Sequence, residues 1–483
     1  MYLNEMATNN QSSIKKNFAY KSALTISTYI MNFITFPYVS RVLGVDKIGL
    51  VSFVDNAVNY FLLFATMGVA ILGVREIATV KEDRNKCNCV YSNILGMNIL
   101  FTIITLIIYF AFIIFVADFN RYKELFYVGG AKILFTAFLV EWYFTGVENF
   151  RYITIRSLLI KLLYVIAVFF LIRTEDDYTL YFVLTVLVVV INAVINMVYI
   201  HKFVNLIKHE LFSKKYIKQN LSLGIYSIMT SMYLTFNVMF LGFCSTNTEV
   251  GYYTTAFKLY SVILGFFTAF TNVMLPRMSS LLAEGEKERF QNLIDKSFEA
   301  MCTFSIPLIL CSIIMAPQII YILSGPGYEG AITPMRIIMP AVLFVGIAQV
   351  FALQILLPMK KDKVLFTASI LGAFVSLLIN IFAVPSMQSI GSAIVLVSAE
   401  IVVTLVYMVY TLWNKLAKFS IQAISKNIFY SLPSVLICYL CRYYIINSFF
   451  SVGLAICLST LFWLGMNIVF KTWIGNICYR RHM

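Results

Sequence analysis

Long apolar segments alternate with short polar ones along the whole chain. Most apolar segments hold about 20 or more residues, which at about 1.5 Å per residue crosses the ~30 Å hydrocarbon core of a bilayer. Every backbone N–H in hydrocarbon must be bonded within its own segment, so the segments predict helices. The alternation of a barrel, with its period of two, is absent. The predicted segments are 17–43, 48–74, 89–116, 123–145, 152–172, 178–201, 219–243, 250–275, 297–322, 331–357, 364–385, 390–413, 427–446 and 449–470.

Composition supports this pattern. The chain has 483 residues, of which 60% are hydrophobic and 12% are charged. We therefore predict an all-α polytopic membrane protein with about fourteen transmembrane helices. The net charge of +14 suggests nucleic acid as a partner in a soluble protein. Here the placement of the charges explains it better, and we expect no nucleic-acid partner.

Lysine and arginine gather on one set of alternate loops, for example around 81–86, 202–218 and 360–363, and are sparse on the other set. Basic loops stay on the cytoplasmic side of a membrane protein. Both termini are therefore predicted to be cytoplasmic, and the even number of helices agrees. The polar first residues and the missing cleavage site predict no signal peptide.

The two halves of the chain contain a similarly spaced pair of residues. Gly49 opens and Arg75 closes one apolar segment, and Gly251 and Arg277 bound another at the same separation. This predicts two six-helix lobes in a parallel repeat, followed by two additional C-terminal helices. The predicted divisions are a polar cytoplasmic tail over 1–14, a lobe over 15–201, a basic cytoplasmic linker over 202–218, a lobe over 219–413, and two helices with a cytoplasmic tail over 414–483.

Five charged residues fall deep inside apolar segments: Asp55, Lys132, Lys161, Lys258 and Glu400. Each costs about 2.5–3.5 kcal/mol at the centre of a bilayer, so they should face water or one another. Lysines exceed acids, which favours a hydrated cationic cleft shared by the lobes. The alternative is static pairing between helices, for example of Asp55 with Lys258.

The candidate substrate-binding residues of this cleft are Lys132, Lys161, Lys258 and Arg41, and the candidates for coupling to an ion are Asp55 and Glu400. A further charged group lies at the junction of the fourth and fifth predicted helices, where a structural ion-pair network is the favoured interpretation. Its members are Glu141, Glu148, Arg151 and Arg156.

No enzyme signature is present. The chain lacks a P-loop and a GxSxG motif, and its three histidines are predicted to lie in cytoplasmic loops or the tail. The nine cysteines are scattered, and the pair Cys87 and Cys89 has no metal-ligand partners nearby in the sequence. We therefore predict no catalytic residues, no cofactor and no metal, and no drive by ATP from this chain alone.

Four stretches resemble Wzx-type polysaccharide flippases of the multidrug/oligosaccharidyl-lipid/polysaccharide (MOP) exporter superfamily. The likeness extends over residues 15–415, with the last two helices less distinctive. The stretches are Phe36–Gly44 with Ile48, Gly49 and Gly73–Ala78; Glu141–Arg156; Ser324–Tyr328; and Leu356–Lys360.

The resemblance implies a flippase in the bacterial cytoplasmic membrane. It would carry undecaprenyl-diphosphate-linked oligosaccharide units of O-antigen, capsule or exopolysaccharide by alternating access, with H⁺ or Na⁺ coupling. Its expected partners are the lipid-linked oligosaccharide, membrane lipids, and a polysaccharide polymerase with its chain-length regulator. The resemblance assigns no residue an essential role. The alternatives are a lipid II flippase, a drug/cation antiporter of the multidrug and toxin extrusion type, whose cleft should be acidic and aromatic, and a membrane polymerase, for which the outer loops are too short.

Overall fold

The computed structural model describes residues 2–207, 210–211, 213–234, 236–418 and 422–469. These residues form helices and no strand, and ten of the helical stretches are long and apolar enough to cross a membrane. The fold is therefore the predicted all-α polytopic membrane protein. Contacts group the chain into two units, Met1–Phe243 and Cys244–Met483.

Two elements are too long for one membrane crossing, and each contains a reversal of the chain. Helix α1 (Tyr2–Thr66) has 65 residues, about 100 Å of helix, and is broken at Gly44, whose φ of 72° suits glycine. Helix α16 (Asp362–Trp413) is broken at Gln388, with φ of 50°. Both breaks fall between pairs of predicted helices. Helix α1 itself begins much earlier than the predicted residue 17.

The residues on both sides of Gly44 pack beside the link between two later helices, α7 (Phe150–Leu171) and α8 (Tyr178–Ile200). The Tyr38 hydroxyl donates to the Ile172 carbonyl at 2.7 Å, and the Lys47 ammonium lies 4.8 Å from the centre of the Tyr178 ring. The first reversal is thereby fixed against one end of the α7–α8 pair.

Two further breaks, each at a residue with positive φ, divide helices that the hydrophobic pattern predicts as continuous. At Met67, with φ of 43°, the chain leaves α1 and begins α2 (Val69–Val80) after Gly68. At Val140, with φ of 40°, it leaves the region of α5 (Lys123–Thr136) and begins the short α6 (Glu141–Gly146). Hydropathy continues across both points, so the apolar pattern alone does not reveal them.

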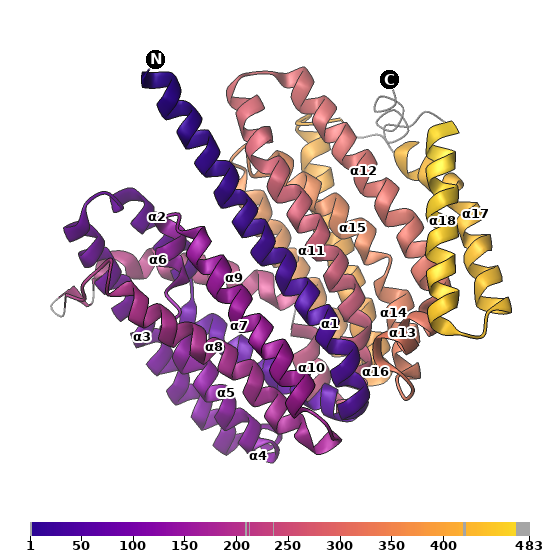
Figure 1. Cartoon of the computed structure of the whole chain (residues 1–483), viewed down its shortest axis with the longest axis horizontal. Helices are drawn as coiled ribbons and strands as arrows, with labels where there is room; N and C mark the ends of the chain where they lie inside the picture. Colours follow the sequence, from indigo (N-terminus) through magenta and orange to yellow (C-terminus); the bar gives the residue numbers. More distant parts are fainter. Residues whose placement is uncertain (1, 208–209, 212, 235, 419–421, 470–483) are drawn as a thin grey trace. The chain divides into compact units, whose positions relative to one another are not determined.

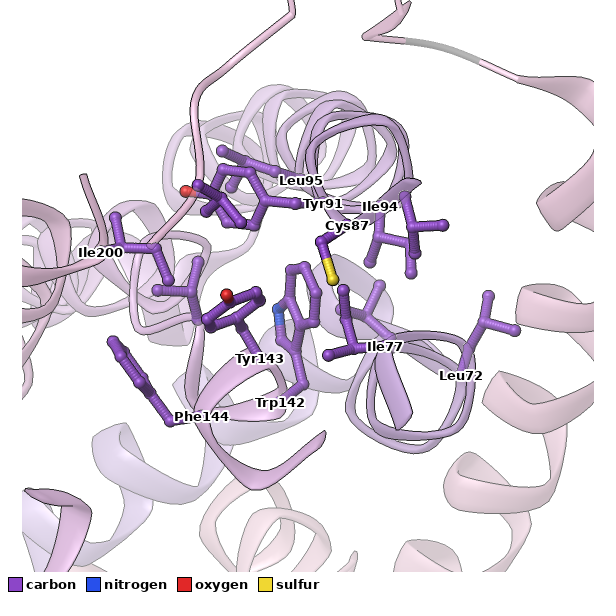
Figure 2. Close-up of a cluster of buried hydrophobic side chains, with 14 of the residues drawn as sticks. Leu72, Ile77, Cys87, Tyr91, Ile94, Leu95, Trp142, Tyr143, Phe144 and Ile200 are labelled. Atoms are coloured by element: carbon purple, nitrogen blue, oxygen red, sulfur yellow. The ribbon is translucent and has the colours of Figure 1, made fainter. Parts of the chain in front are cut away.

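The remaining elements of the first unit are α3 (Arg84–Phe115), α4 (Ala117–Arg121), η1 (Glu175–Asp177), α9 (Lys214–Leu234) and α10 (Phe236–Cys244). A buried cluster joins α2, α3, α6 and the end of α8, and Figure 2 shows Trp142 between Tyr143 on one side and Ile77 on the other. A Cβ on Gly73 would lie 2.6 Å from the Trp142 ring, so the indole packs directly on the backbone of α2. This cluster fixes α6 on the helices around it.

Helix α9 packs on the end of α1 and on α2. A Cβ added to Gly68 would lie 2.4 Å from the Leu223 side chain, and one added to Gly224 would lie 2.7 Å from that of Met67. The backbones therefore approach closely at these glycines. As a result α9 and most of α10 group with the first unit. The sequence places the division earlier, at 202–218; the six-helix duplication stays a prediction.

The second unit contains α11 (Asn247–Ala283), α12 (Lys287–Ile314), α13 (Ala316–Ser324), η3 (Glu329–Ala331), α14 (Ile332–Ile338), α15 (Ala341–Gln349), the π-helical η4 (Val350–Leu356), α16, α17 (Gln422–Tyr444) and α18 (Ser448–Val469). Helices α17 and α18 pack together as an antiparallel pair, and α17 lies along α12 (Figure 1). They are the two predicted additional helices; the predicted cytoplasmic tail that follows them lies outside the described residues.

Candidate functional site

One candidate residue, Lys132, lies in an ion pair with another, Asp55. The Lys132 ammonium donates to the Asp55 carboxylate at 2.6 Å and to the Asn59 amide oxygen at 2.8 Å. Asp55 and Asn59 lie one turn apart on α1, and the Asn59 amide also donates to Asp55 at 3.2 Å. The Lys132 side chain is 13% exposed and that of Asp55 is 35% exposed. The trio is neutral when both charged groups are ionised.

A glycine on α5 brings this trio together. A Cβ on Gly129 would lie 2.5 Å from Val58 Cγ2, so α5 approaches α1 closely at this level. Lys132 follows Gly129 by three residues, about one turn of helix, and Asp55 and Asn59 flank Val58 on α1. The close approach places the lysine within reach of both polar side chains.

Lys161 has a different environment on α7. Its ammonium donates to the Thr28 hydroxyl, whose own proton is donated to the Leu24 carbonyl at 2.9 Å. The Lys161 side chain is partly buried. Within the described ranges, no carboxylate lies within ion-pair distance of it. The described polar partner of Lys161 is therefore a hydroxyl, whereas that of Lys132 is a carboxylate.

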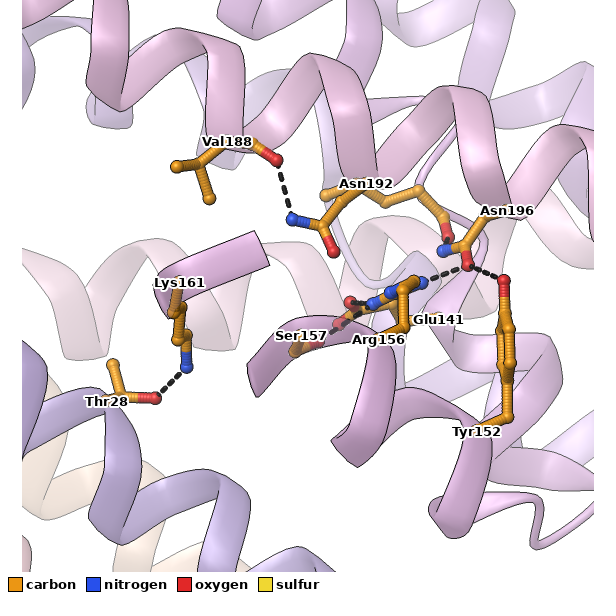
Figure 3. Close-up of polar contacts among 10 residues, drawn as sticks. Thr28, Glu141, Tyr152, Arg156, Ser157, Lys161, Val188, Asn192 and Asn196 are labelled. Carbon is orange, nitrogen blue, oxygen red and sulfur yellow. Dashed lines mark hydrogen bonds and ion pairs between the residues drawn. The ribbon is translucent and has the colours of Figure 1, made fainter. Parts of the chain in front are cut away.

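On the same helix, Arg156 is the centre of a polar network (Figure 3). Its guanidinium donates to the Glu141 carboxylate at 2.5 Å, to the Ser157 hydroxyl at 3.1 Å and to the Asn196 amide oxygen. That amide oxygen also accepts from the Tyr152 hydroxyl at 3.0 Å.

The network is the predicted ion-pair junction in part, because it contains Glu141 and Arg156. The Asn196 amide donates to the Leu139 carbonyl, just before the left-handed Val140, and so holds the link between α5 and α6. Glu148, another of the four predicted members, instead accepts from Lys81 at 2.9 Å. These contacts explain how the chain is held where its hydrophobic pattern shows no break.

The other candidates lie elsewhere. Arg41 is exposed near the reversal at Gly44 and donates to the Pro37 carbonyl at 2.7 Å. Lys258, on α11, and Glu400, on α16, belong to the second unit. The Glu400 side chain is 2% exposed, and it accepts from the Tyr260 hydroxyl at 3.2 Å. A cleft shared by the two units stays a prediction.

The sequence reasoning missed two residues that contact the candidates, Thr28 and Tyr260. Both are uncharged and lie in apolar segments, so charge and depth do not single them out. A search for hydroxyl residues in the predicted helices would return many residues that contact no candidate. Such hydroxyls commonly bond to their own helix, as that of Thr404 does to the Glu400 carbonyl at 2.7 Å. Among the described residues, no three His, Cys, Asp or Glu side chains are grouped as metal ligands.

A bundle of membrane-crossing helices with charged side chains held inside it has the architecture of a membrane transporter. Two solved transporters have this fold. The lipid II flippase MurJ, in an inward closed conformation, matches 94% of this chain and 98% of its own, with a TM-score of 0.76 and 16% identity. A multidrug resistance MATE family transporter of the MOP superfamily, facing inward, matches 84% and 99%, with a TM-score of 0.57 and 13% identity.

Sequence comparison gives the family. Residues 14–282, more than half of the chain, match the family model described as "Polysaccharide biosynthesis protein", and the chain belongs to this family. It is 24% identical over 412 residues to a protein of Escherichia coli K12 named "Putative O-antigen transporter", covering 84% of this chain and 99% of that one. A protein of the same name from Shigella dysenteriae is 23% identical over 400 residues. The chain is thus a multi-pass membrane protein with the MOP transporter fold, as the resemblance predicted.

Proposed function

We propose that this protein is a flippase that moves a polyprenyl-diphosphate-linked oligosaccharide, such as an O-antigen unit, across the bacterial cytoplasmic membrane. The observation that carries the proposal is Lys161, a partly buried cation whose described partner is the Thr28 hydroxyl. A cation at this depth is costly unless an anion visits it. A diphosphate headgroup is such an anion, and the family and the named relatives point to a lipid-linked glycan as the molecule that carries it.

Lys161 and the Lys132–Asp55 pair have different roles in this proposal. Lys161 binds the diphosphate directly, in a medium where charge interactions are much stronger than in water. Lys132 becomes available only when its bond to Asp55 opens. Lys258 and Arg41 contribute positive charge along the route through the protein, and the lipid tail stays in the bilayer.

The membrane potential favours export. Two negative charges that move outward against an inside-negative potential gain about 2.3 kcal/mol per charge per 100 mV. In the proposed orientation of the protein, both termini and the basic loops lie in the cytoplasm. Alternation between inward-facing and outward-facing states supplies the path, and the polymerase with its chain-length regulator receives the unit outside.

Glu400 is the better of the two candidates for coupling to protons. Asp55 already has a cation and an amide as partners, whereas Glu400 is buried with a tyrosine hydroxyl and, among the described residues, has no ion pair. A buried carboxyl without a cation is more easily accommodated as the neutral acid. Loading and release of a proton at Glu400 would reset the empty carrier. Glu400→Gln should then slow repeated export at equal protein levels.

The proposal is tested by export of the glycan in cells that lack their own transporter of this type. Lys161→Glu places a carboxylate where the diphosphate would bind, so we expect loss of surface glycan by at least about a hundredfold. Lys161→Arg keeps the charge and should retain most export. The matched control is Lys123→Glu, a charge reversal at the first residue of α5, away from Thr28.

Protein levels in the membrane are measured beside export, so that loss of folding is not read as loss of transport. Full export by Lys161→Glu at a normal protein level would remove the diphosphate-binding role of this lysine. A lysine-bearing site also argues against a drug/cation antiporter, since cationic substrates would be repelled. Efflux of ethidium from cells, driven by this protein, would contradict that statement.

A further inference from the structure

A pocket of about 550 Å³ lies at the end of the first unit where α2 meets α3 and α6 meets α7. This is within the size range of small-molecule sites. Its lining side chains come from three separate parts of the chain and include neither Lys132 nor Lys161. They are Lys81, Glu82, Arg84, Cys87, Tyr143, Val147, Glu148, Asn149 and Phe203.

The most informative lining residue is Tyr143. Its side chain is 4% exposed and is held by edge-on ring contacts with Tyr91 and Phe144, at 5.9 and 5.6 Å between ring centres. The hydroxyl has no hydrogen-bond partner within the described parts of the chain, although it lines the pocket. A hydroxyl that lacks a protein partner beside a pocket is available to bond to a molecule in that pocket.

The rim of the pocket is built from an ion pair and a strained corner. Lys81, at the end of α2, donates to Glu148 at 2.9 Å. Glu148 has φ of 61°, a left-handed conformation that is unfavourable for a residue other than glycine. Asn149 begins α7 by accepting from the Tyr152 amide. The corner is thus fixed in place beside the pocket.

The charges of the lining residues balance, with two cations and two carboxylates. Both carboxylates would repel a free phosphate. Arg84 and Lys81 would repel a cationic ligand. Donors and acceptors stand together with aromatic rings: the Arg84 guanidinium, the Glu82 carboxylate, the Tyr143 hydroxyl and the Phe203 ring. A sugar ring fits this combination, because it offers several hydroxyls to charged partners and an apolar C–H face to a ring.

We propose that this pocket binds a sugar residue of the transported glycan before translocation, at a site separate from the one that holds the diphosphate. The inference rests on the proposed function for the identity of the glycan. It assigns Tyr143, Arg84 and Glu82 to hydrogen bonds with sugar hydroxyls, and Phe203 to contact with the sugar face. The flippase would thereby select its oligosaccharide on the side where the basic loops lie.

The experiment measures binding of the free oligosaccharide to the purified full-length protein in detergent. The probe is the host's own repeat unit, released from its lipid diphosphate by mild acid, and binding is followed by calorimetry. Tyr143→Phe removes only the hydroxyl, and we expect the Kd to rise about tenfold. Arg84→Gln, at an exposed position, is expected to weaken binding by a similar factor. Tyr91→Phe removes a hydroxyl from the same aromatic cluster outside the pocket lining and should leave the Kd unchanged.

Three results would overturn the proposal: no binding of the free oligosaccharide to the wild type, equal binding by wild type and both pocket variants, or binding of inorganic pyrophosphate that the same two variants weaken. Two variants are used so that a folding defect in one leaves the other to decide. Lys161→Glu separates this proposal from the function itself. The Lys161→Glu protein should lose export and still bind the free oligosaccharide normally. The pocket variants should bind the free oligosaccharide weakly. Normal export by Lys161→Glu beside weakened binding by Tyr143→Phe would refute the transport site and leave the pocket standing.

Discussion

Lys132 and Lys161 are the same residue type, both lie in apolar segments of the first unit, and both reach a polar group on α1. Their partners differ: Lys132 contacts a carboxylate and an amide, and Lys161 contacts a threonine hydroxyl. The first lysine is neutralised within the protein and contributes to packing of helices. In the proposed function the second leaves one positive charge for a ligand. Intramembrane position is the same for both lysines, and their partners are what distinguish them.

Reversing the charge of the acid should give the largest effect. Asp55→Lys places a second ammonium beside Lys132 and leaves no carboxylate in the trio, which costs about 3 kcal/mol or more. We expect a lower thermal unfolding temperature in detergent and less protein in the membrane. The double variant Asp55→Lys with Lys132→Asp restores opposite charges and should recover most of the loss. No recovery in the double variant would mean that the pair is not the source of the cost.

Removing each lysine in turn should separate the two sites directly. Lys132→Met leaves Asp55 without its cation and is expected to destabilise the protein by about 1–3 kcal/mol, reduced by the partial exposure of that carboxylate. Lys161→Met removes an unneutralised cation and leaves no orphaned acid, so stability should be unchanged or raised, while export is lost. Thermal unfolding and export are measured on both variants. Equal destabilisation by the two changes would contradict the distinction.

A smaller effect is expected from the hydroxyl that Lys161 contacts. Thr28→Val keeps the shape of the side chain and removes the acceptor, so the lysine loses a charge-assisted hydrogen bond worth about 1.5–3 kcal/mol. Export should fall severalfold and should recover in Thr28→Ser. The control is Thr66→Val, since the Thr66 hydroxyl donates to its own helix at Leu62. If both valine variants export equally well, Thr28 does not orient the lysine.

The smallest effect concerns a carboxylate that backbone amides stabilise. Asp83 accepts from the amides of Lys86 and Asn85 at the start of α3, and these bonds, with the nearby Lys86 ammonium, hold the pKa of Asp83 below its ordinary value of 3.8. A lowered pKa stabilises the fold above pH 3.8, and the benefit is lost as pH falls through the lowered value. Hydrogen exchange at these two amides should accelerate on acidification, and Asp83→Asn should remove that pH dependence.

Much of the fold follows from periodicity and length. The predicted break after residue 43 coincides with the reversal at Gly44, and the predicted gap between 385 and 390 contains the reversal at Gln388. Lysine and acid positions at depth were also readable, because charge in a long apolar run is conspicuous. The breaks at Met67 and Val140 were not, since their flanking residues stay apolar and long-range contacts hold them, such as that of Asn196 with Leu139.

The sequence by itself determined that the chain crosses the membrane many times, which polar side chains lie inside it, and which family it resembles, because hydropathy and short motifs are local properties. Only the tertiary structure decided that Asp55 pairs with Lys132, that Lys161 contacts Thr28, and that Tyr143 lines a pocket. Those contacts join residues 77, 133 and more than 50 positions apart. They depend on which helix faces pack together, and close approaches such as that of Gly129 to Val58 set this packing.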